Sequence, residues 1–485
     1  MHRYLAVDLG AESGRLVLGT LADGKLELEE IHRFKNGMLR VMGHYHWNTF
    51  RLFEEMLAGL RKCNALSPAP VSLGVNTWGV DFGLLGPDGM LWGAPIAYRD
   101  PRTDGLIERF AERMPQEITY GKTGIAFQPF NTLYQLMALA EDNPELLSAA
   151  SDFLMMPDLF HYFFTGNKVT EFTLASTSQM VNVETGDWDA DILDAAGIPQ
   201  ELMPAIYPPG TDVGGITQEI REQTGFEGLR VIAPACHDTA AAVAAVPAEG
   251  GEYAYISSGT WSLMGMEVRT PVNTEAARAC NLTNEGGVDG TYRLLKNIMG
   301  LWLVQRCRAG FDATLDYAAL TKLAEEAPAF VSLINPNDAR FFNPVSMPDA
   351  IAEFCKETGQ PVPDSPGAYV RCCLESLALE YRWTVGELRR VQDAPIRTIH
   401  IVGGGTQNTL LSQFTADATG LPVVAGPVEA TAIGNLLVQA QAQGHVASLA
   451  EARAIVRASS DLVTYSPKDT QAWDAANERF EALKK

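Results

Sequence analysis

The sequence predicts an α/β protein made of two related halves around a cleft. Its 485 residues exceed the usual size of one domain. A pattern of strand, small polar turn and strand opens the chain and returns at residues 252–268. Strand-like segments elsewhere alternate with helix-like ones, which is typical of α/β folds. We expect domains at residues 1–245 and 252–485, joined by the linker "VPAEGG" at 246–251.

Composition excludes several classes of protein. The formal charge is −22, from 59 acidic and 37 basic residues, which argues against a nucleic-acid surface or a basic membrane anchor. No apolar run is long enough to span a bilayer, and the N-terminus lacks a signal-peptide core. The seven cysteines show no C-x-x-C spacing, so we expect a reducing cytoplasm. The sequence leaves open whether Cys355 and Cys372 form a disulfide bond.

The first half begins as a three-stranded meander and continues with a helix and a further strand. Asn48 is a candidate N-cap for the helix, and the turn residues are small and polar. The expected segments are strands at 3–10, 15–21 and 26–34, a turn at 11–14, a helix at 49–63 and a strand at 71–85.

After its hairpin, the second half contains further strand and helix signals. "IRTIHIVGGGTQNTLLSQFTADATG" predicts a strand, three glycines and an amphipathic helix. "EATAIGNLLVQAQAQG" predicts another helix, ended by Gly444. "LLKNIMGLWLVQRC" at 294–307 also predicts a helix, which would place Asn297 and Gln305 on one side about 12 Å apart.

The stretch "HDTA" places His237 and Asp238 between a buried-looking strand and an Ala-rich helix. Asp238 is a candidate helix cap, because Asp is favoured at that position. It is also a candidate general base, because ligands of open α/β sheets bind at strand ends. The helix N-terminus would then favour the ionised carboxylate.

Three glycine-containing stretches are candidate phosphate or nucleotide contacts. In "DLGAESGR", small residues allow close approach of backbone N–H groups, Arg15 could neutralise phosphate, and Asp8 could hold a metal-bound water. "SSGTWS" at 257–262 offers donors from Ser258 to Thr260, and "VGGGTQN" at 402–408 joins a strand to a helix. Each of the two hairpin turns also fits an ordinary turn.

"NTWGVDF" places Trp78 and Asp81 at another strand end. An indole face beside a carboxylate suits a sugar, whereas the alternative is a core tryptophan beside a turn aspartate. His44 and His46 could share a strand face, but two histidines without a third ligand are assigned no metal.

Together these residues resemble the FGGY family of carbohydrate kinases. The resemblance covers nearly the whole chain and is carried by "AVDLGAESGR", "NTWGVDFGLL", "AYRDPRT", "FQPFNTLYQL", "MPDLFHYFFTG", "HDTA", "SSGTWSLMG", "TNEGG", "LLKNIMGLWL" and "IHIVGGGTQNTLL". It implies two ribonuclease-H-like domains, as in actin, hexokinase and Hsp70, flanking a deep cleft. It is closest to members that phosphorylate L-rhamnulose at the 1-hydroxyl with ATP and Mg²⁺ in L-rhamnose catabolism, as a monomer or small homo-oligomer.

The resemblance also implies roles for individual residues. Asp238 would be the catalytic base, and Asp8 would lie near the magnesium ion. The sugar would contact Trp78, Gly79, Asp81, His237, Thr239 and Asn297. ATP would contact Ala11, Glu12, Ser13, Gly14, Arg15, Gly259, Thr260, Gln305, Gly403, Gly404, Gly405 and Asn408.

Two features leave alternatives open. Cys236 stands where related kinases often have Ser, so a lowered pKa would make the enzyme sensitive to thiol reagents. The sugar could be another ketose, such as L-fuculose, L-xylulose or L-ribulose, because one methyl contact discriminates only weakly. Outside the family, a non-catalytic actin-like or Hsp70-like nucleotide switch and an acetate-kinase-like acyl kinase are alternatives.

Overall fold

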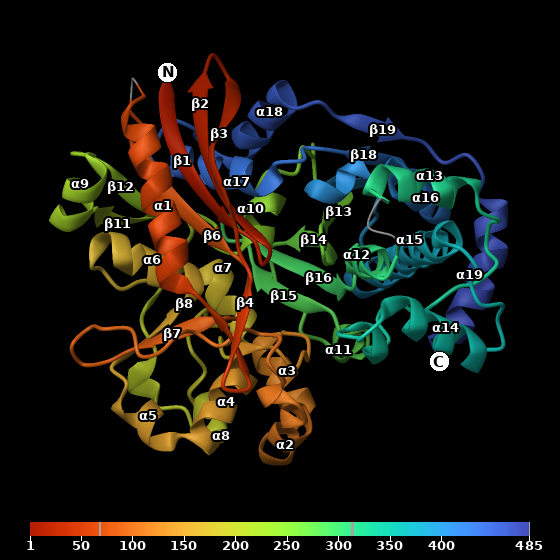
Figure 1. Ribbon diagram of the computed structural model, residues 1–485, viewed down its shortest axis with the longest axis horizontal. Coiled ribbons are helices and arrows are strands. Elements are labelled where there is room, and N and C mark those ends of the chain that lie inside the picture. Colours follow the sequence, from red (N-terminus) through yellow and green to blue (C-terminus); the bar gives the residue numbers. More distant parts are fainter. Residues whose placement is uncertain (67–68, 312–314, 485) are drawn as a thin grey trace. The chain divides into compact units, whose positions relative to one another are not determined.

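Two sheets of similar construction organise the chain, as its computed structural model shows (Figure 1). The structure describes residues 1–66, 69–311 and 315–484. These residues form two compact units, and each unit contains more than one stretch of the sequence. Unit 1 comprises Met1–Ala245, Glu267–Leu294 and Ala430–Ser459, and unit 2 comprises Val246–Met266, Leu295–Glu429 and Ser460–Lys485.

The sheet of unit 1 has six strands in the order β11-β12-β6-β1-β2-β3. The antiparallel strands β1, β2 and β3 form the predicted meander, and β6 and β12 are parallel to β1. The strands are β1 His2–Leu9, β2 Ser13–Ala22, β3 Lys25–Lys35, β6 Ser72–Thr77, β11 Thr211–Gly215 and β12 Arg230–Ala233.

Unit 2 repeats this arrangement with β14, β13, β17, β18 and β19 side by side. The hairpin β13–β14 is antiparallel, β17 and β18 add in parallel, and β19 adds antiparallel. The same sequence of pairings joins β2, β1, β6, β12 and β11 in unit 1. The predicted duplication is therefore confirmed. The strands are β13 Tyr253–Ser258, β14 Ser262–Val268, β17 Thr398–Val402, β18 Val423–Ala425 and β19 Val463–Tyr465.

Of the remaining strands, β16 and β15 extend the second sheet beyond β14, and the others have two to four residues. These remaining strands are β4 Met38–Val41, β5 His44–Trp47, β7 Phe82–Leu85, β8 Asp152–Met155, β9 Thr170–Glu171, β10 Ile206–Tyr207, β15 Thr283–Gly286 and β16 Tyr292–Ile298. The single strand predicted at 71–85 is interrupted, because β6 ends at Thr77 and β7 begins at Phe82. The segment from Trp78 to Asp81 is therefore not paired in a strand, and its side chains contact other parts of the fold.

Helices cover both faces of the sheet in unit 1 (Figure 1). Alternate residues of β6 face opposite sides, since successive side chains of a strand alternate. Gly74 faces α17, where a Cβ would lie 2.7 Å from Asn435 Oδ1, whereas Leu73 and Val75 join the core with residues of α1 and α6. The helices of unit 1 are α1 Thr49–Asn64, α2 Leu106–Arg113, α3 Gln116–Thr123, α4 Thr132–Asp142, α5 Pro144–Ala149, α6 Met156–Thr165, α7 Phe172–Ala175, α8 Ala190–Ala196, α9 Gln218–Thr224, α10 Asp238–Ala244, α11 Glu275–Ala279, α17 Ala430–Ala442 and α18 Leu449–Ser459.

Helix α17 belongs to unit 1 although it lies late in the sequence. Buried amides attach it to the sheet: Gln439 Nε2 donates to the Leu5 carbonyl (2.9 Å), and Ser72 Oγ donates to Gln439 Oε1 (2.7 Å). Burying these polar groups is tolerated because each finds a partner. The helix predicted to end at Gly444 is confirmed, with Gly444 in the left-handed region at φ 73°.

The helices of unit 2 include the longest in the chain, α15. They are α12 Trp302–Ala309, α13 Tyr317–Glu326, α14 Met347–Glu357, α15 Pro366–Gln392, α16 Thr409–Thr419 and α19 Gln471–Leu483. Cys355 and Cys372 lie on α14 and α15, and the seven cysteines, all among the described residues, are buried and form no disulfide.

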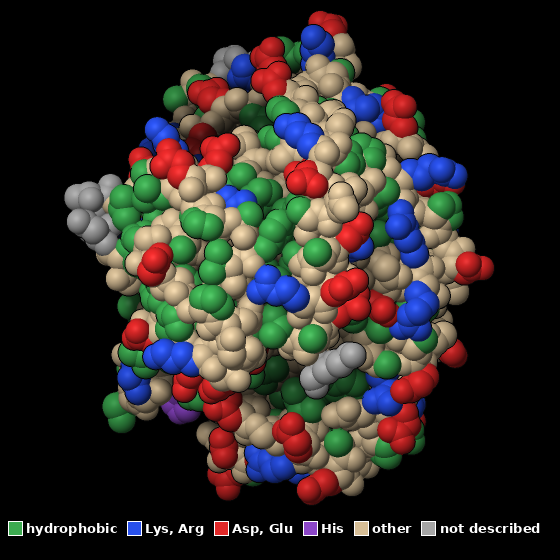
Figure 2. Space-filling view, turned by 90° about the vertical axis from the view of Figure 1, so that its right-hand side faces the viewer, with side chains coloured by type: hydrophobic (Ala, Val, Ile, Leu, Met, Phe, Trp, Pro, Cys, Tyr) green, Lys and Arg blue, Asp and Glu red, His purple; other side chains and the backbone are tan. Residues whose placement is uncertain are grey.

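Figure 2 shows the distribution of charged side chains on one face of the molecule. On the face in Figure 2, acidic and basic side chains are interspersed and do not form one basic field. Among the described residues, no helix combines the length and apolar character needed to cross a bilayer.

We predict that Gly434→Ala lowers the melting temperature of the protein. A Cβ at Gly434 of α17 would lie 1.8 Å from the carbonyl oxygen of Ala241 of α10, and backbone cannot give way as a side-chain end can. Overpacking of this kind costs about 1–3 kcal/mol. Differential scanning calorimetry measures the effect.

Gly386→Ala is the matched control, because Gly386 is exposed within α15 and a Cβ there meets nothing within 4 Å. This change should be neutral or stabilising by up to ~1 kcal/mol. Equal melting temperatures for the two variants would contradict the close approach of α10 and α17.

Candidate active site

The carboxyl ends of β6 and β12 bring together most of the sugar-contact residues predicted for unit 1. Thr77 N donates to the Cys236 carbonyl (3.0 Å), and Thr77 forms a parallel bridge with His237. Gly79 follows directly, and a Cβ there would lie 3.4 Å from His237 Nε2. A side chain at position 79 would therefore lie against the imidazole of His237.

Asp238 is the first residue of α10, and the N-cap position belongs to His237. The prediction that Asp238 caps the helix is therefore wrong. Its Oδ1 accepts hydrogen bonds from its neighbour Thr239, at 2.6 Å from the backbone N and 3.2 Å from Oγ1. The Asp238 side chain is 33 % exposed, so the carboxylate is open to a ligand.

Burial raises the pKa of Asp238 above its ordinary value. His237 opposes this shift, and the like charge of Asp8 adds to it. The expected effect of the helix N-terminus on the Asp238 carboxylate stays a prediction; the net shift of the pKa is upward, and loss of solvent is its largest cause. A carboxylate with a raised pKa is a stronger base than an ordinary aspartate.

His237 is held by a buried ion pair. Its Nδ1 lies 3.2 Å from Glu285 Oε2 and 3.1 Å from Arg293 Nη2, and its Nε2 lies 3.4 Å from Asp238 Oδ1. Arg293 Nη2 is 3.0 Å from Glu285 Oε2, and Arg293 Nε donates to the Gly286 carbonyl (2.9 Å). Glu285 and Arg293 therefore hold the imidazole of His237 against the carboxylate of Asp238.

The charges of this group compensate one another. The Arg293 side chain has no exposed surface, and those of Glu285 and His237 are 8 % exposed. Burial alone would raise the pKa of Glu285, but Arg293 and His237 outweigh it, and the pKa is lowered. Glu285 is thus ionised beside Arg293, which avoids an isolated buried charge.

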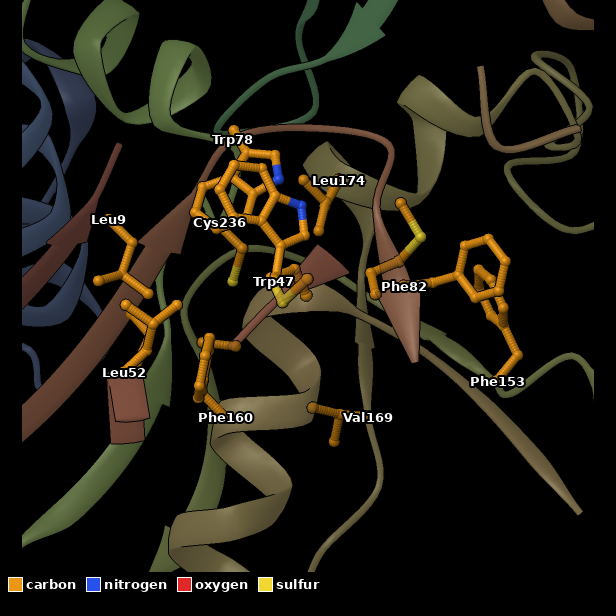
Figure 3. Close-up of a cluster of buried hydrophobic side chains, with 14 of the residues drawn as sticks. Leu9, Trp47, Leu52, Trp78, Phe82, Phe153, Phe160, Val169, Leu174 and Cys236 are labelled. Atoms are coloured by element: carbon orange, nitrogen blue, oxygen red, sulfur yellow. The ribbon is translucent and has the colours of Figure 1, made fainter. Parts of the chain in front are cut away.

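Asp81 is fully buried and bonded to two indoles. Trp47 Nε1 and Trp78 Nε1 donate to its Oδ2 at 2.6 and 2.9 Å, and Gln135 Nε2 donates to Oδ1 at 3.2 Å. The two indole rings lie against each other with centroids 4.2 Å apart (Figure 3). Burial raises the pKa of Asp81 to about 6. Asp81 orients the indoles and offers no open carboxylate to a sugar.

The first hairpin places the predicted phosphate residues around a short turn. The turn is closed by Gly10 N, which donates to the Ser13 carbonyl (2.9 Å), so Ser13, Gly14 and Arg15 already lie on β2. Asp8 and Arg15 are cross-strand partners, and Arg15 donates to Asp8 Oδ2 from Nε (3.1 Å) and Nη2 (2.9 Å).

The other two residues of the first turn differ in exposure and in packing. Ala11 is partly buried and Glu12 is exposed at the turn itself. Packing requires a glycine at position 14, because a Cβ there would lie 2.4 Å from the Phe34 ring.

In unit 2 the second hairpin turn meets the start of α12. Leu301 N donates to the Gly259 carbonyl (3.1 Å) and Trp302 N to the Thr260 carbonyl (3.0 Å). Gln305 lies one turn further along α12, and its buried Oε1 has no hydrogen-bond partner among the described residues. An unpaired buried acceptor of this kind is suited to a ligand donor.

The glycine run packs against the same hairpin. A Cβ on Gly405 would lie 1.9 Å from Ser258 Oγ, and one on Gly403 would lie 3.1 Å from the Ser258 carbonyl. Gly403 also adopts a left-handed φ of 88°. The glycines are therefore required by the approach of β17 to β13, and Gly404, with nothing within 4 Å of its Cβ position, leaves open space for a ligand.

Three expectations for unit 2 are corrected. The predicted helix over 294–307 is wrong in its first part, since β16 runs to Ile298 and α12 begins at Trp302. Asn297 consequently lies on a strand, and the helical spacing to Gln305 does not apply. A 3₁₀ turn, Gly404–Gln407, contains two of the three glycines and precedes α16.

Asn408 is the N-cap of α16, with Oδ1 accepting from Leu411 N (2.9 Å). Its side-chain oxygen is therefore already engaged in the helix start.

Cys236 is not an activated thiol. It has no exposed surface, and burial raises its pKa well above the usual value, with Glu171 and Asp158 adding to the shift. The low pKa required for sensitivity to thiol reagents is absent.

Four supporting residues were missed by sequence reasoning: Trp47, Gln135, Glu285 and Arg293. Glu285 lies in "TNEGG", a stretch that carried the family resemblance, so its motif was a usable signal. Gln135 lies in "FQPFNTLYQL", which also carried the resemblance, whereas Arg293 lies outside the stretches that did. Only the fold brings Gln135 to Asp81 and Arg293 to His237.

Comparison with protein families decides the assignment. The model of the N-terminal domain of the FGGY family of carbohydrate kinases matches residues 3–245, and that of its C-terminal domain matches 254–443. The chain belongs to the FGGY family of carbohydrate kinases.

This carbohydrate kinase is similar over its length to several rhamnulokinases. One from Bacteroides thetaiotaomicron is 48% identical over 99% of each chain, and one from Bacillus subtilis is 41% identical over 96% of each.

Among solved structures, a xylulose kinase from Lactobacillus acidophilus has a TM-score of 0.84 at 16% identity, covering 100% of this chain and 98% of its own. A Plasmodium falciparum glycerol kinase with ADP has a TM-score of 0.78 at 17% identity, covering 100% and 97%. These structures share the two-domain fold.

We predict that Glu285→Gln destabilises this kinase substantially. The change leaves the Arg293 guanidinium buried without a counter-charge, and breaking a buried pair in this way costs about 3–5 kcal/mol. Thermal unfolding followed by circular dichroism measures the loss.

Glu275→Gln is the control, because Glu275 pairs with Arg278 on the exposed surface of the same unit. An exposed pair contributes ~0–1 kcal/mol, so this variant should melt close to the wild type. If Glu285→Gln melts there too, Arg293 does not depend on Glu285.

Proposed function

We propose that the chain transfers the γ-phosphoryl group of ATP to the 1-hydroxyl of L-rhamnulose, giving ADP and L-rhamnulose 1-phosphate. The observation that carries this proposal is the similarity to rhamnulokinases over nearly the whole chain, at 41–48% identity. The reaction belongs to L-rhamnose catabolism. We place it in the cytoplasm, with no nucleic-acid or membrane partner.

Asp238 is the proposed catalytic base. Phosphoryl transfer depends mainly on positioning and charge stabilisation, but a sugar hydroxyl is a poor nucleophile at neutral pH. The partly exposed carboxylate of Asp238 would accept the hydroxyl proton as the oxygen–phosphorus bond forms. The raised pKa of Asp238 makes it a better acceptor for that proton.

The residues beside Asp238 are the proposed sugar contacts. His237 and Thr239 flank the base, and Gly79 lies beside the imidazole of His237. Trp78 would contribute its indole face, since its Nε1 is already bonded to Asp81. Asp81 would therefore act on the sugar through Trp78 alone. Asn297 remains a proposed contact from unit 2.

ATP would be held by residues of both hairpins and the glycine run. Arg15 offers a guanidinium, and Ser13 a hydroxyl, on β2. In unit 2, Gln305 offers its unpaired amide oxygen, and Gly404 offers open backbone. The full proposed set is Ala11, Glu12, Ser13, Gly14, Arg15, Gly259, Thr260, Gln305, Gly403, Gly404 and Gly405, with Asn408 acting through the start of α16.

Magnesium is the proposed metal ion, with Asp8 as the residue that would hold it through water. Asp8 lies at the end of β1, and its Oδ2 is bonded to Arg15. One ion-paired carboxylate fits Mg²⁺, which keeps several waters and is held largely by nucleotide phosphates. When bound, the ion would neutralise phosphate charge.

A sugar panel tests the proposal. ADP release with Mg-ATP is measured for L-rhamnulose, L-fuculose, L-xylulose, L-ribulose, D-xylulose and glycerol, with Asp238→Asn assayed beside the wild type. We expect the highest kcat/KM for L-rhamnulose and a loss of about 10²–10⁴-fold in kcat for Asp238→Asn.

Asp349→Asn, an exposed first-turn aspartate of α14, is the control and should keep full activity. Preference for another ketose would overturn the substrate and retain the reaction type. ATP binding without any sugar-dependent turnover would overturn the kinase reaction and favour a nucleotide switch.

We further predict the pH dependence of kcat/KM. The base must be deprotonated, so activity falls as the pH drops through the pKa of Asp238, which lies above the ordinary aspartate value. Asp8→Asn removes a like charge and lowers that pKa, so the acid limb should move to lower pH. An acid limb that stays in place would contradict the coupling between Asp8 and Asp238.

A further inference from the structure

A buried group of three metal-ligating side chains lies behind the candidate active site. Asp158 and His161 are three residues apart on α6, so they share one face of that helix. Cys236 comes from the segment between β12 and α10, and its sulfur points toward α6 (Figure 3). One ligand atom from each of the three side chains lies within 4.8 Å of the others.

The group is closed to solvent and incompletely bonded. All three residues have no exposed surface. Within the described residues, Asp158 Oδ2 and both ring nitrogens of His161 have no hydrogen-bond partner. A buried imidazole with neither nitrogen bonded loses the hydration free energy of both nitrogens and gains no hydrogen bond in return. Such groups require an explanation. His161 Nδ1 lies 3.8 Å from Asp158 Oδ1, too far for a hydrogen bond between them.

The charges of the three ligands suit a divalent ion. Burial raises the pKa of Asp158 and of the Cys236 thiol and lowers that of His161 to about 3, so burial disfavours the charged form of each group. A divalent ion would displace one proton from Asp158 and one from Cys236, while His161 donates a lone pair. The complex of one dication with two anions and a neutral ligand carries no net charge, which a closed apolar site tolerates.

The ligand types select the ion. Sulfur, nitrogen and oxygen donors together suit Zn²⁺ and similar transition ions, whereas Mg²⁺ and Ca²⁺ require oxygen ligands. With bonds of about 2.0–2.3 Å to each ligand, two ligands of a tetrahedral ion lie roughly 3.5 Å apart, so the ligand atoms, which now lie within 4.8 Å of one another, would approach by up to about 1.3 Å.

We propose that Asp158, His161 and Cys236 bind one Zn²⁺ or a similar divalent transition-metal ion. The ion would fasten the segment that precedes His237 and Asp238 to α6. The same segment is already anchored through Cys236 N, which donates to Glu171 Oε2 (3.0 Å). The metal site would therefore support the position of the base without contacting substrate, and it does not depend on which sugar is phosphorylated.

Metal content and cobalt spectroscopy test the proposal. The full chain is produced without a tag, and its zinc is measured by mass spectrometry after dialysis. A second preparation is grown with Co²⁺ in place of Zn²⁺. We expect close to one zinc ion per chain and a thiolate-to-cobalt absorption band in the near ultraviolet, independent of any sugar or nucleotide.

Variants locate the site. Cys236→Ser should lose the band and His161→Gln should lose the zinc, while Cys63→Ser, a buried thiol elsewhere in unit 1, should keep both. Trace zinc and no band in the wild type would overturn the proposal, whether or not the variants fold. Zinc that is retained in Cys236→Ser and lost in Cys355→Ser would place the ion on α14 and overturn the assignment.

Discussion

The ion pair between Arg293 and Glu285 is the interaction on which the candidate active site depends. A guanidinium with no exposed surface is tolerable only beside a carboxylate, and that carboxylate also reaches the imidazole of His237. His237 in turn lies against Asp238. The ion pair of Arg293 and Glu285 therefore acts on the position of the proposed base, Asp238, through His237.

A second constraint is the burial of aromatic and polar groups beneath the site. Asp81 holds Trp47 and Trp78 by their indole nitrogens, so the indole faces have fixed directions. Such a carboxylate supports a binding surface without belonging to it. The unpaired group on α6 has the opposite property, because Asp158 and His161 are buried with bonding capacity left over. The first arrangement is complete in itself, and the second has bonding capacity for the metal ion that we propose.

The two sheets show how a duplicated architecture supports different tasks. Each unit pairs an antiparallel hairpin with a parallel strand on one side, β6 in unit 1 and β17 in unit 2. In unit 1 the end of β6 meets His237, which precedes the proposed base Asp238. In unit 2 the end of β17 is a glycine run packed on Ser258, where we propose backbone contacts with a nucleotide.

The sequence by itself determined the α/β class, the repeated hairpin and the strand-end position of "HDTA", because alternation, turn composition and helix stops are local properties of the chain. Its local signals failed where β16 replaced a predicted helix, since "LLKNI" has apolar residues compatible with either period. Only the tertiary structure decided that Asp81 is closed to solvent, that Arg293 and Glu285 hold His237, and that Cys236 meets His161. These contacts join residues far apart in the sequence. They are defined by burial and charge compensation, and neither produces a periodic pattern in the sequence.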